Sequence, residues 1–297
     1  MKVKGGLNIE GMKYKMLYSR KRLDESKYIE VAKNYYAVIE EWDKKNSSER
    51  HLEFCYCFSE RRKNLLFTGQ SACSIYGIPR VDPFEVRPHC IRENTMRTDI
   101  ICWRYGKTDE HARTLNGLKV VSPIRGIWDL EKYDTSYSLL TSINHCLYKK
   151  LFSKEKFLTA LNSEQKRPGR KRLFKLISLA THKCESPLET LAWIAINNAG
   201  FHNPKQQVHI YDKQHFVGRV DMCWENGNNK VVLELDGLNK YEDRNVLVAE
   251  KIREDKLRFI GYELVRATWK DVRDGKLIKM LNEKNISKKR NYIRGII

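Results

Sequence analysis

The chain has 297 residues, of which 56 are lysine or arginine and 37 are aspartate or glutamate, so its formal net charge is +19 at pH 7. No apolar run approaches the roughly 20 residues that cross a bilayer, and the start lacks the apolar segment of a secretory signal, so we expect a cytoplasmic protein without a membrane partner. Ribosomal and membrane-surface proteins can be equally basic, but phosphates attract basic proteins whatever the nucleotide sequence, and this predicts a nucleic acid, DNA or RNA, as the partner.

The N-terminal region, residues 1–165, is expected to be a smaller α+β domain. Apolar residues recur at a spacing near 3.6 in residues 25–44, which predicts a helix with one buried face. Further on, the recurring features are a helix of small residues that ends in Tyr-Gly-Ile-Pro, a pair of strands and a second helix. The segments concerned are LLFTGQSACSIYGIP, FEVRPHC, TDIICWRYG and GLKVVSPIRGIWDL, in which Ser122-Pro123 opens the second helix.

These four segments resemble the middle region of AbiE-type antitoxins and related regulators. The resemblance implies that the N-terminal domain positions the chain on DNA or on a partner protein.

A dense run of positive charge with Pro168-Gly169 at its centre separates this domain from the rest. Residues 166–181 therefore read as a basic linker. Its arginines and lysine, Arg170, Lys171 and Arg172, are candidates for contact with a phosphate backbone, although a solvated run would look the same.

Downstream, the sequence alternates helical and strand patterns. We expect helices at residues 186–199, 246–260 and from about 269, and strands near 206–211, 217–224, 230–236 and 262–267. The turn around Asn226-Gly227 predicts an antiparallel hairpin, and the strands on either side of the second helix are candidates for a parallel crossover. This order indicates an α/β fold with a mixed sheet flanked by helices.

Two of these strands carry carboxylates that a packed sheet does not need. Glu234 and Asp236 are two apart and share a face, and Asp221 lies on the partner strand, so three carboxylates could line one spot. A buried carboxylate costs several kcal/mol unless it is compensated, and hard divalent cations such as Mg²⁺ or Mn²⁺ bind carboxylate oxygens. Glu189, in the helix start SPLE, either caps that helix or adds to the metal site.

The segments SPLE, Ala199-Gly200, Gln206-Gln207-Val208, GRVD, VVLELDG, EKIREDKLRFIGY and ELVRATWKDV occur in an order that resembles the PD-(D/E)XK nuclease superfamily. Within it, they are similar to endonuclease domains related to very-short-patch-repair enzymes. The resemblance implies a restriction-endonuclease-like domain at residues 182–280, followed by a basic tail at 281–297.

The resemblance also implies metal-assisted hydrolysis of DNA. Asp221, Glu234 and Asp236 would hold the metal, with Glu189 completing the site. The family's usual Glu-x-Lys is Glu234-Leu235-Asp236 here, so its lysine is absent. Lys240 is the first stand-in that we expect, with Lys251 and Arg253 on the following helix as alternatives.

Two further choices stay open at the level of the sequence. Gln206 or Gln207 either contacts the substrate or is an ordinary polar residue of an edge strand. The whole domain is either an endonuclease or a degenerate nuclease fold that serves as an antitoxin-like, non-catalytic DNA-binding repressor.

Overall fold

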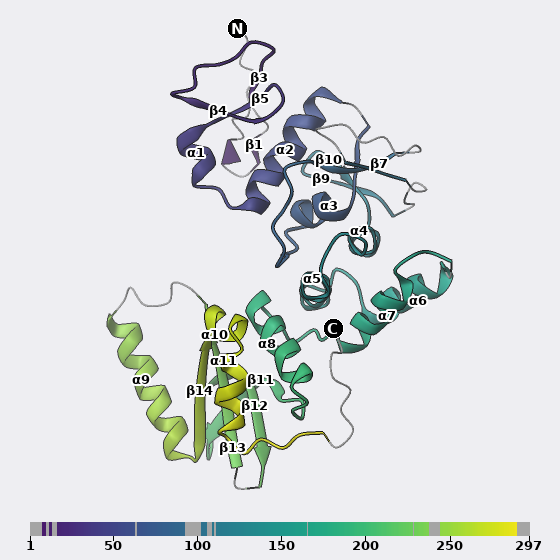
Figure 1. Ribbon diagram of the computed structural model, residues 1–297. Coiled ribbons are helices and arrows are strands. Elements are labelled where there is room, and N and C mark those ends of the chain that lie inside the picture. Colours follow the sequence, from purple (N-terminus) through teal and green to yellow (C-terminus); the bar gives the residue numbers. More distant parts are fainter. Residues whose placement is uncertain are drawn as a thin grey trace. The chain divides into compact units, whose positions relative to one another are not determined.

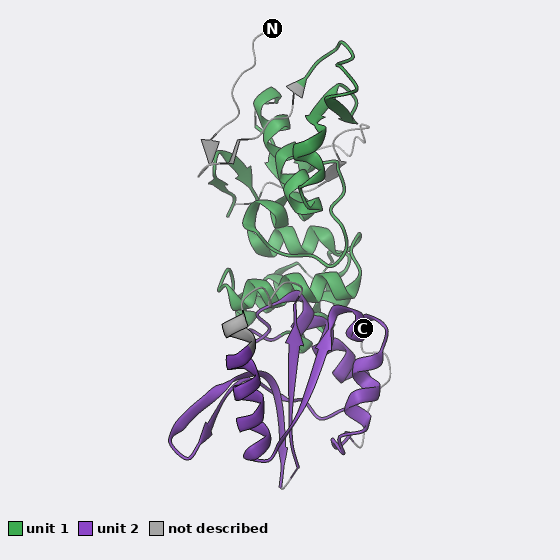
Figure 2. Ribbon diagram, turned by 90° about the vertical axis from the view of Figure 1, so that its left-hand side faces the viewer, with its two compact units in different colours: residues 1–180 green, residues 181–297 purple. Residues whose placement is uncertain are grey.

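The computed structural model describes residues 8–9, 12–13, 17–62, 64–92, 102–105, 109, 111–164, 166–227, 229–237 and 244–289 (Figure 1). It divides into two compact units, Met1–Ala180 and Thr181–Ile297 (Figure 2). The first unit is the longer one, so the expectation of a smaller N-terminal domain is wrong. The division also lies at the end of the segment that was expected to be a linker.

Unit 1 contains three small sheets and a set of helices. Its five-stranded sheet has the order β8-β7-β6-β10-β9, and a three-stranded sheet has the order β3-β5-β4. The strands are β1 (Asn8–Ile9), β2 (Met12–Lys13), β3 (Leu17–Tyr18), β4 (Tyr28–Ala32), β5 (Tyr35–Val38), β6 (Leu66–Phe67), β7 (His89–Arg92), β8 (Cys102–Tyr105), β9 (Arg113–Leu115) and β10 (Leu118–Val120). The helices are α1 (Ile39–Asp43), α2 (Ser47–Arg61), α3 (Gly69–Tyr76), α4 (Pro123–Leu130), α5 (Ser136–Tyr148), α6 (Lys154–Ser163) and α7 (Arg170–Leu179).

The helix expected at residues 25–44 is wrong: the segment forms the hairpin β4–β5 followed by the short helix α1. Asn34 adopts a left-handed φ of 67° in the turn, which asparagine tolerates better than most residues. Three consecutive residues are buried, Tyr35, Tyr36 and Ala37, and a helix with a single buried face does not give this pattern. Aromatic and β-branched residues favour strands, and here that preference outweighed an apolar spacing that happened to match a helix.

The helix starts and ends of the middle region are confirmed. Helix α3 ends at Gly77, which takes a left-handed φ of 67°, as glycine after a helix commonly does. Helix α4 has Pro123 in its first turn, and the Ser122 hydroxyl accepts a hydrogen bond from the Arg125 backbone N–H at 3.3 Å. These local signals therefore placed both helices correctly from the sequence.

The predicted linker at residues 166–181 is instead mostly the helix α7, which buries Leu173, Leu176 and Ile177 in unit 1. Charge alone suggested a solvated run, but three apolar residues at helical spacing give the segment a packed face. Three of its basic residues, Arg167, Arg170 and Arg172, bind groups of their own unit. Arg172 donates to the main-chain oxygens of Glu131 at 2.6 Å and Asp134 at 2.8 Å.

Unit 2 is a single mixed sheet of order β11-β12-β13-β14 with helices on both faces (Figure 1). Its elements are α8 (Pro187–Asn198), β11 (Lys205–Asp212), β12 (His215–Asn226), β13 (Asn229–Asp236), α9 (Arg244–Phe259), β14 (Tyr262–Thr268), α10 (Trp269–Arg273) and α11 (Lys276–Asn282). The antiparallel hairpin β12–β13 and the parallel pairing of β13 with β14 are both confirmed. The α/β class of the fold is thus as predicted.

Two apolar clusters lie on the two faces of this sheet. One contains Met222, Leu233 and Leu235 together with residues of α8, α10 and α11. The other contains Cys223, Val232 and Leu257, the last from α9. Alternate residues of β13 thus enter different clusters, which is why its carboxylates emerge on the face that α9 covers. Across the described residues of both units, no helix is long and apolar enough to cross a membrane.

Candidate functional site

Asp221 and Glu234 lie where strands β12 and β13 part. The last regular pair of their ladder is Met222↔Leu233, so the two acidic residues follow it directly on neighbouring strands. Asp221 Oδ2 accepts a hydrogen bond from the Leu235 backbone N–H at 2.9 Å. A carboxylate thus takes the place of the main-chain acceptor that a continuing ladder would supply, and the charge of Asp221 acts on Glu234 of the neighbouring strand.

Glu234 is held by an arginine of α9. Arg253 donates from Nη1 to Glu234 Oε1 at 3.0 Å and from Nη2 to Oε2 at 2.7 Å, and Glu250 accepts from the same guanidinium at 2.6 Å. Burial raises the pKa of Glu234; Arg253 opposes this shift, and the charge of Asp221 adds to it. A Cβ on Gly218 would lie 2.9 Å from Arg253 Cδ, so the absence of a side chain there gives the arginine its path.

Glu189 approaches the same place from the first turn of α8. Its side chain is nearly buried, with 7% exposed, and Oε2 accepts from the Glu185 backbone N–H at 2.9 Å. The Ser186 hydroxyl caps the helix, as predicted, but Glu189 binds the residue before the cap rather than the cap itself. Burial raises the pKa of Glu189, and the charge of Asp221 raises it further.

The two glutamines of β11 have different environments. Gln206 is buried, accepts from Thr181 Oγ1 at 3.0 Å and donates to Cys184 Sγ at 3.2 Å, which makes it part of the fold. Gln207 Nε2 donates to Glu189 Oε2 at 2.9 Å, while its own Oε1 is buried without a hydrogen-bond partner. Its φ of 53° is unusual for a glutamine in a strand, and such strain is frequent at functional sites.

Asp236 does not join the other carboxylates. It forms an ion pair of 3.6 Å with Arg266 of β14, and Arg266 also binds Glu250 and Glu254 of α9. The predicted spot with three carboxylates is therefore not formed. Among the described residues, no group of three or more histidines, cysteines and acidic residues is arranged to hold a metal ion.

The predicted basic residues are placed as follows. Lys240 falls outside the described residues, Lys251 is exposed on α9, and Arg253 contacts the site. Arg170 donates to the Leu161 main-chain oxygen at 2.6 Å, and Lys171 is exposed on α7 in unit 1.

Sequence reasoning missed two features of this site. The first is the chain of charges that runs from Glu234 through Arg253, Glu250 and Arg266 to Asp236. The spacing of Glu250 and Arg253, which are three apart on a helix, was its one visible signal. The second is the strained backbone of Gln207, for which the sequence holds no signal.

Comparison with protein-family models, curated proteins and solved structures finds no match to this chain. The function is therefore argued below from the geometry of the site.

The raised pKa of Glu189 has a consequence for stability. A native pKa above the unfolded value means that the native state binds the proton more tightly, so this contribution is full below about pH 4.5 and is lost as the pH rises through the native pKa. Glu189→Gln removes that loss. In urea unfolding between about pH 4 and pH 7, the variant should gain stability relative to wild type as the pH rises.

Glu283→Gln, which removes an exposed carboxylate just after α11, is the matched control for the change in charge. A stability difference between Glu189→Gln and wild type that stays constant over this pH range would contradict the expected role of burial.

Proposed function

We propose that unit 2 is a Mg²⁺-dependent endonuclease that hydrolyses phosphodiester bonds of DNA. The observation that carries the proposal is the pairing of Asp221 and Glu234 at the point where β12 and β13 part, with the nearly buried Glu189 close enough to respond to the charge of Asp221. Two carboxylates with raised pKa values lie close to a third, Asp221, and perturbed acids cluster at functional sites.

The donor set fits a hard divalent cation. Asp221 and Glu234 offer carboxylate oxygens on neighbouring strands, and Mg²⁺ is commonly bound by one or two carboxylates together with substrate phosphates. Bound there, Mg²⁺ or Mn²⁺ would supply Lewis-acid activation of the phosphate and of water. The resemblance of the segment order to PD-(D/E)XK nucleases supports the same chemistry.

The chain's own residues would divide the remaining work. Glu189 is fixed by hydrogen bonds from Gln207 and from the Glu185 backbone N–H. It would act as the general base that accepts a proton from a water molecule. Arg253 lies against Glu234 and can donate to a phosphate oxygen as charge builds up there. Lys240 stays a candidate for the same electrostatic role.

The direct test is incubation of the purified chain with plasmid, linear duplex, single-stranded DNA and RNA, with Mg²⁺, with Mn²⁺ or with EDTA. We expect metal-dependent cleavage of DNA. Cleavage of RNA alone would replace the proposed substrate, and no cleavage of any substrate with either metal would overturn the proposal.

One observation favours a second candidate function, an antitoxin-like DNA-binding repressor without catalysis. Arg253 already neutralises Glu234 through two hydrogen bonds, so the fold is satisfied without a metal. For such a repressor, DNA affinity would not depend on Mg²⁺, and a filter-binding titration with and without Mg²⁺ separates it from the nuclease.

Arg253 is expected to compete with the metal. Arg253→Met removes a positive charge at hydrogen-bond distance from Glu234, and a unit charge a few Å away is worth at least about 1 kcal/mol even in water. We therefore expect Mn²⁺ to bind about tenfold more tightly to the variant, measured by electron paramagnetic resonance at pH 8, while DNA cleavage decreases.

Arg258→Met is the matched control on the same helix, because Arg258 lies far out in solvent and pairs only loosely, at 3.9 Å, with Glu254. Equal Mn²⁺ affinity of Arg253→Met and Arg258→Met would show that Arg253 and the metal do not share Glu234.

A further inference from the structure

Unit 1 contains a pocket that is unrelated to the carboxylates of unit 2. Its volume is about 840 Å³, which lies in the range of small-molecule sites. The pocket lies among the start of β9, the start of α4, helix α6 and the segment between α6 and α7. Its lining includes an apolar part, with Ile124, Leu151 and Phe152, and hydroxyl groups, among them those of Thr159 and Ser163.

An arginine in this pocket is anchored at one end and open at the other. Arg125 Nε donates to both oxygens of Asp129, at 3.1 and 2.9 Å, and its side chain is only 15% exposed. No described residue accepts a hydrogen bond from the two Nη groups of Arg125. The guanidinium is thus held in position with its forked end uncommitted, which is the geometry that binds phosphate in a bidentate way.

Two positive side chains meet a single carboxylate at this position. Arg167 also binds Asp129 and lies over the Trp128 ring at 4.3 Å, so two guanidinium groups share one carboxylate. Burial lowers the pKa of Arg167, and the charge of Arg125 lowers it further. An additional anion would relieve this repulsion.

Three acidic residues also line the pocket: Asp109 and Glu155 keep their charge beside neutral hydrogen-bond donors, and Glu164 is paired with a cation. Asp109 accepts from the Ser122 backbone N–H at 2.7 Å and from the Ser122 hydroxyl at 2.8 Å, and Glu164 pairs with Arg167 at 3.5 Å. At the start of α6, the Glu155 backbone N–H and then a hydrogen bond from Ser153 lower the pKa of the Glu155 carboxyl.

Two further cations have no such partner among the described residues. Arg113 and Lys156 line the same pocket, and neither forms a hydrogen bond or an ion pair there through its side chain. Together with the fork of Arg125, they make three positive groups, which match a phosphate monoester of charge about −1.5 to −2 better than a single carboxylate.

We propose that this pocket binds a phosphate monoester with an organic body of the size of a nucleoside monophosphate. The fork of Arg125, with Arg113 and Lys156, receives the phosphate, and the apolar wall receives the body. A free nucleotide and the 5′-phosphate end of an oligonucleotide present the same group, so both are sources of this phosphate.

The test is calorimetric titration of the full chain at 0.15 M salt with four nucleoside monophosphates, with adenosine and with inorganic phosphate. At least one monophosphate should bind ten times more tightly than inorganic phosphate, and adenosine should not bind. A 5′-phosphorylated and a 5′-hydroxyl oligonucleotide distinguish the two sources. A nucleic-acid end is identified if the pocket binds only the 5′-phosphorylated oligonucleotide and binds it with higher affinity than the monophosphate.

Arg125→Gln should weaken the binding at least tenfold. Arg113→Gln provides a second variant that keeps the fold, because the Arg113 side chain forms no hydrogen bond or ion pair with the described residues. Lys175→Gln removes an exposed positive charge from α7, outside the pocket, and should bind like wild type.

Three results would overturn the proposal. These are no binding of any monophosphate, equal binding by wild type and both arginine variants, and adenosine or inorganic phosphate binding as tightly as the best monophosphate. None of them depends on whether unit 2 cleaves DNA.

Discussion

Asp221→Ala is expected to abolish Mg²⁺-dependent DNA cleavage while DNA retention stays intact or becomes stronger. In the proposed site, the charge of Asp221 acts on both other carboxylates and raises the pKa of Glu189 and of Glu234. Loss of an outer partner of a metal ligand typically costs about 10–100-fold, so loss of a ligand should reduce the cleavage rate by more than about 100-fold. Removal of a negative charge beside the DNA should not weaken its binding.

A second substitution separates charge from structure. Asp221 Oδ2 accepts from the Leu235 backbone N–H, and Asp221→Asn can keep that hydrogen bond through its amide oxygen while it loses the charge. We expect the asparagine variant to melt close to wild type and to cleave as poorly as the alanine variant.

Asp255→Asn is the matched control, because it makes the same chemical change at an exposed position of α9. Plasmid nicking is measured for all variants with Mg²⁺ and with EDTA, and DNA retention by gel shift in EDTA. If Asp221→Asn cuts DNA at the wild-type rate, Asp221 is not a metal ligand and the proposed chemistry fails.

Local sequence signals predicted much of unit 2. Strand alternation, the Asn-Gly turn and the Ser-Pro helix start gave the order and the approximate bounds of α8, β11–β13, α9 and β14. The meeting of Asp221 and Glu234 followed from the register of a hairpin, since a short turn leaves few ways to pair two strands.

Long-range ion pairs could not be predicted in the same way. Asp236 and Glu234 share a face in the sequence pattern, but Arg266 and Arg253 come from later elements and separate the two carboxylates. The position of Arg253 depends on the packing of α9 over Gly218. The two residues are 35 positions apart in the sequence, so no local spacing of residues indicates this contact. The family resemblance and the metal itself stay predictions.

Unit 1 offered weaker signals because its elements are short. In residues 25–44 the period of the apolar residues indicated a helix, whereas residue type indicated strands, and residue type was the better guide. In residues 166–181 positive charge obscured the apolar positions of α7, and Arg172 binds the main chain of the turn between α4 and α5.

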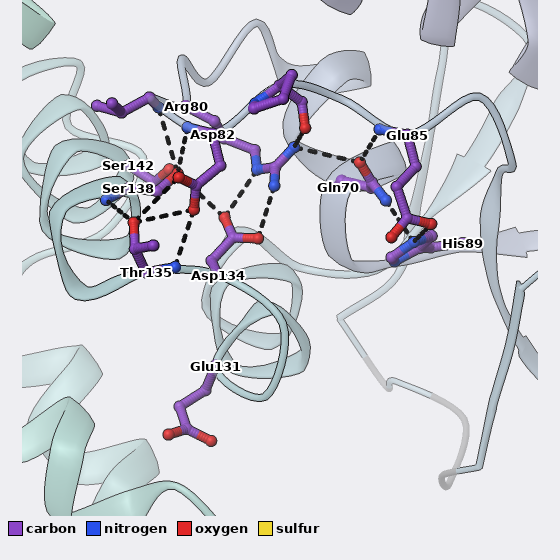
Figure 3. A network of polar contacts seen from close by, with 12 residues as sticks. Gln70, Arg80, Asp82, Glu85, His89, Glu131, Asp134, Thr135, Ser138 and Ser142 are labelled. Atoms are coloured by element: carbon purple, nitrogen blue, oxygen red, sulfur yellow. Dashed lines mark hydrogen bonds and ion pairs between the residues drawn. The ribbon is translucent and has the colours of Figure 1, made fainter.

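Arg80→Met is expected to destabilise unit 1 by about 3–5 kcal/mol, because it leaves a buried carboxylate without its cation. Arg80 and Asp134 form a two-point ion pair, with Nε to Oδ2 at 2.8 Å and Nη2 to Oδ1 at 2.6 Å, and only 4% and 1% of their side chains are exposed. Arg80 also donates to Gln70, and Ser138 donates to Asp134, so the pair connects the loop after α3 with the start of α5 (Figure 3).

Hydrogen exchange read by mass spectrometry can test this in the full chain, because peptides of unit 2 serve as an internal reference. Peptides that cover α3 and α5 should exchange much faster in Arg80→Met, while those that cover β12 and β13 should not change. Arg87→Met is the matched control: its pairing with Glu85 at 3.7 Å is exposed, and such surface pairs contribute about 0–1 kcal/mol.

The double variant Arg80→Met with Asp134→Leu decides whether the expected loss comes from the unpaired charge or from lost packing. Replacement of a whole buried ion pair by apolar residues of similar volume is often neutral, whereas removal of one partner is not. If the isolated charge is the cause, the double variant should recover most of the protection that Arg80→Met loses. If the double variant exchanges as fast as the single one, the hydrogen bonds to Gln70 and Ser138 hold the two segments together, and the ion pair itself contributes little.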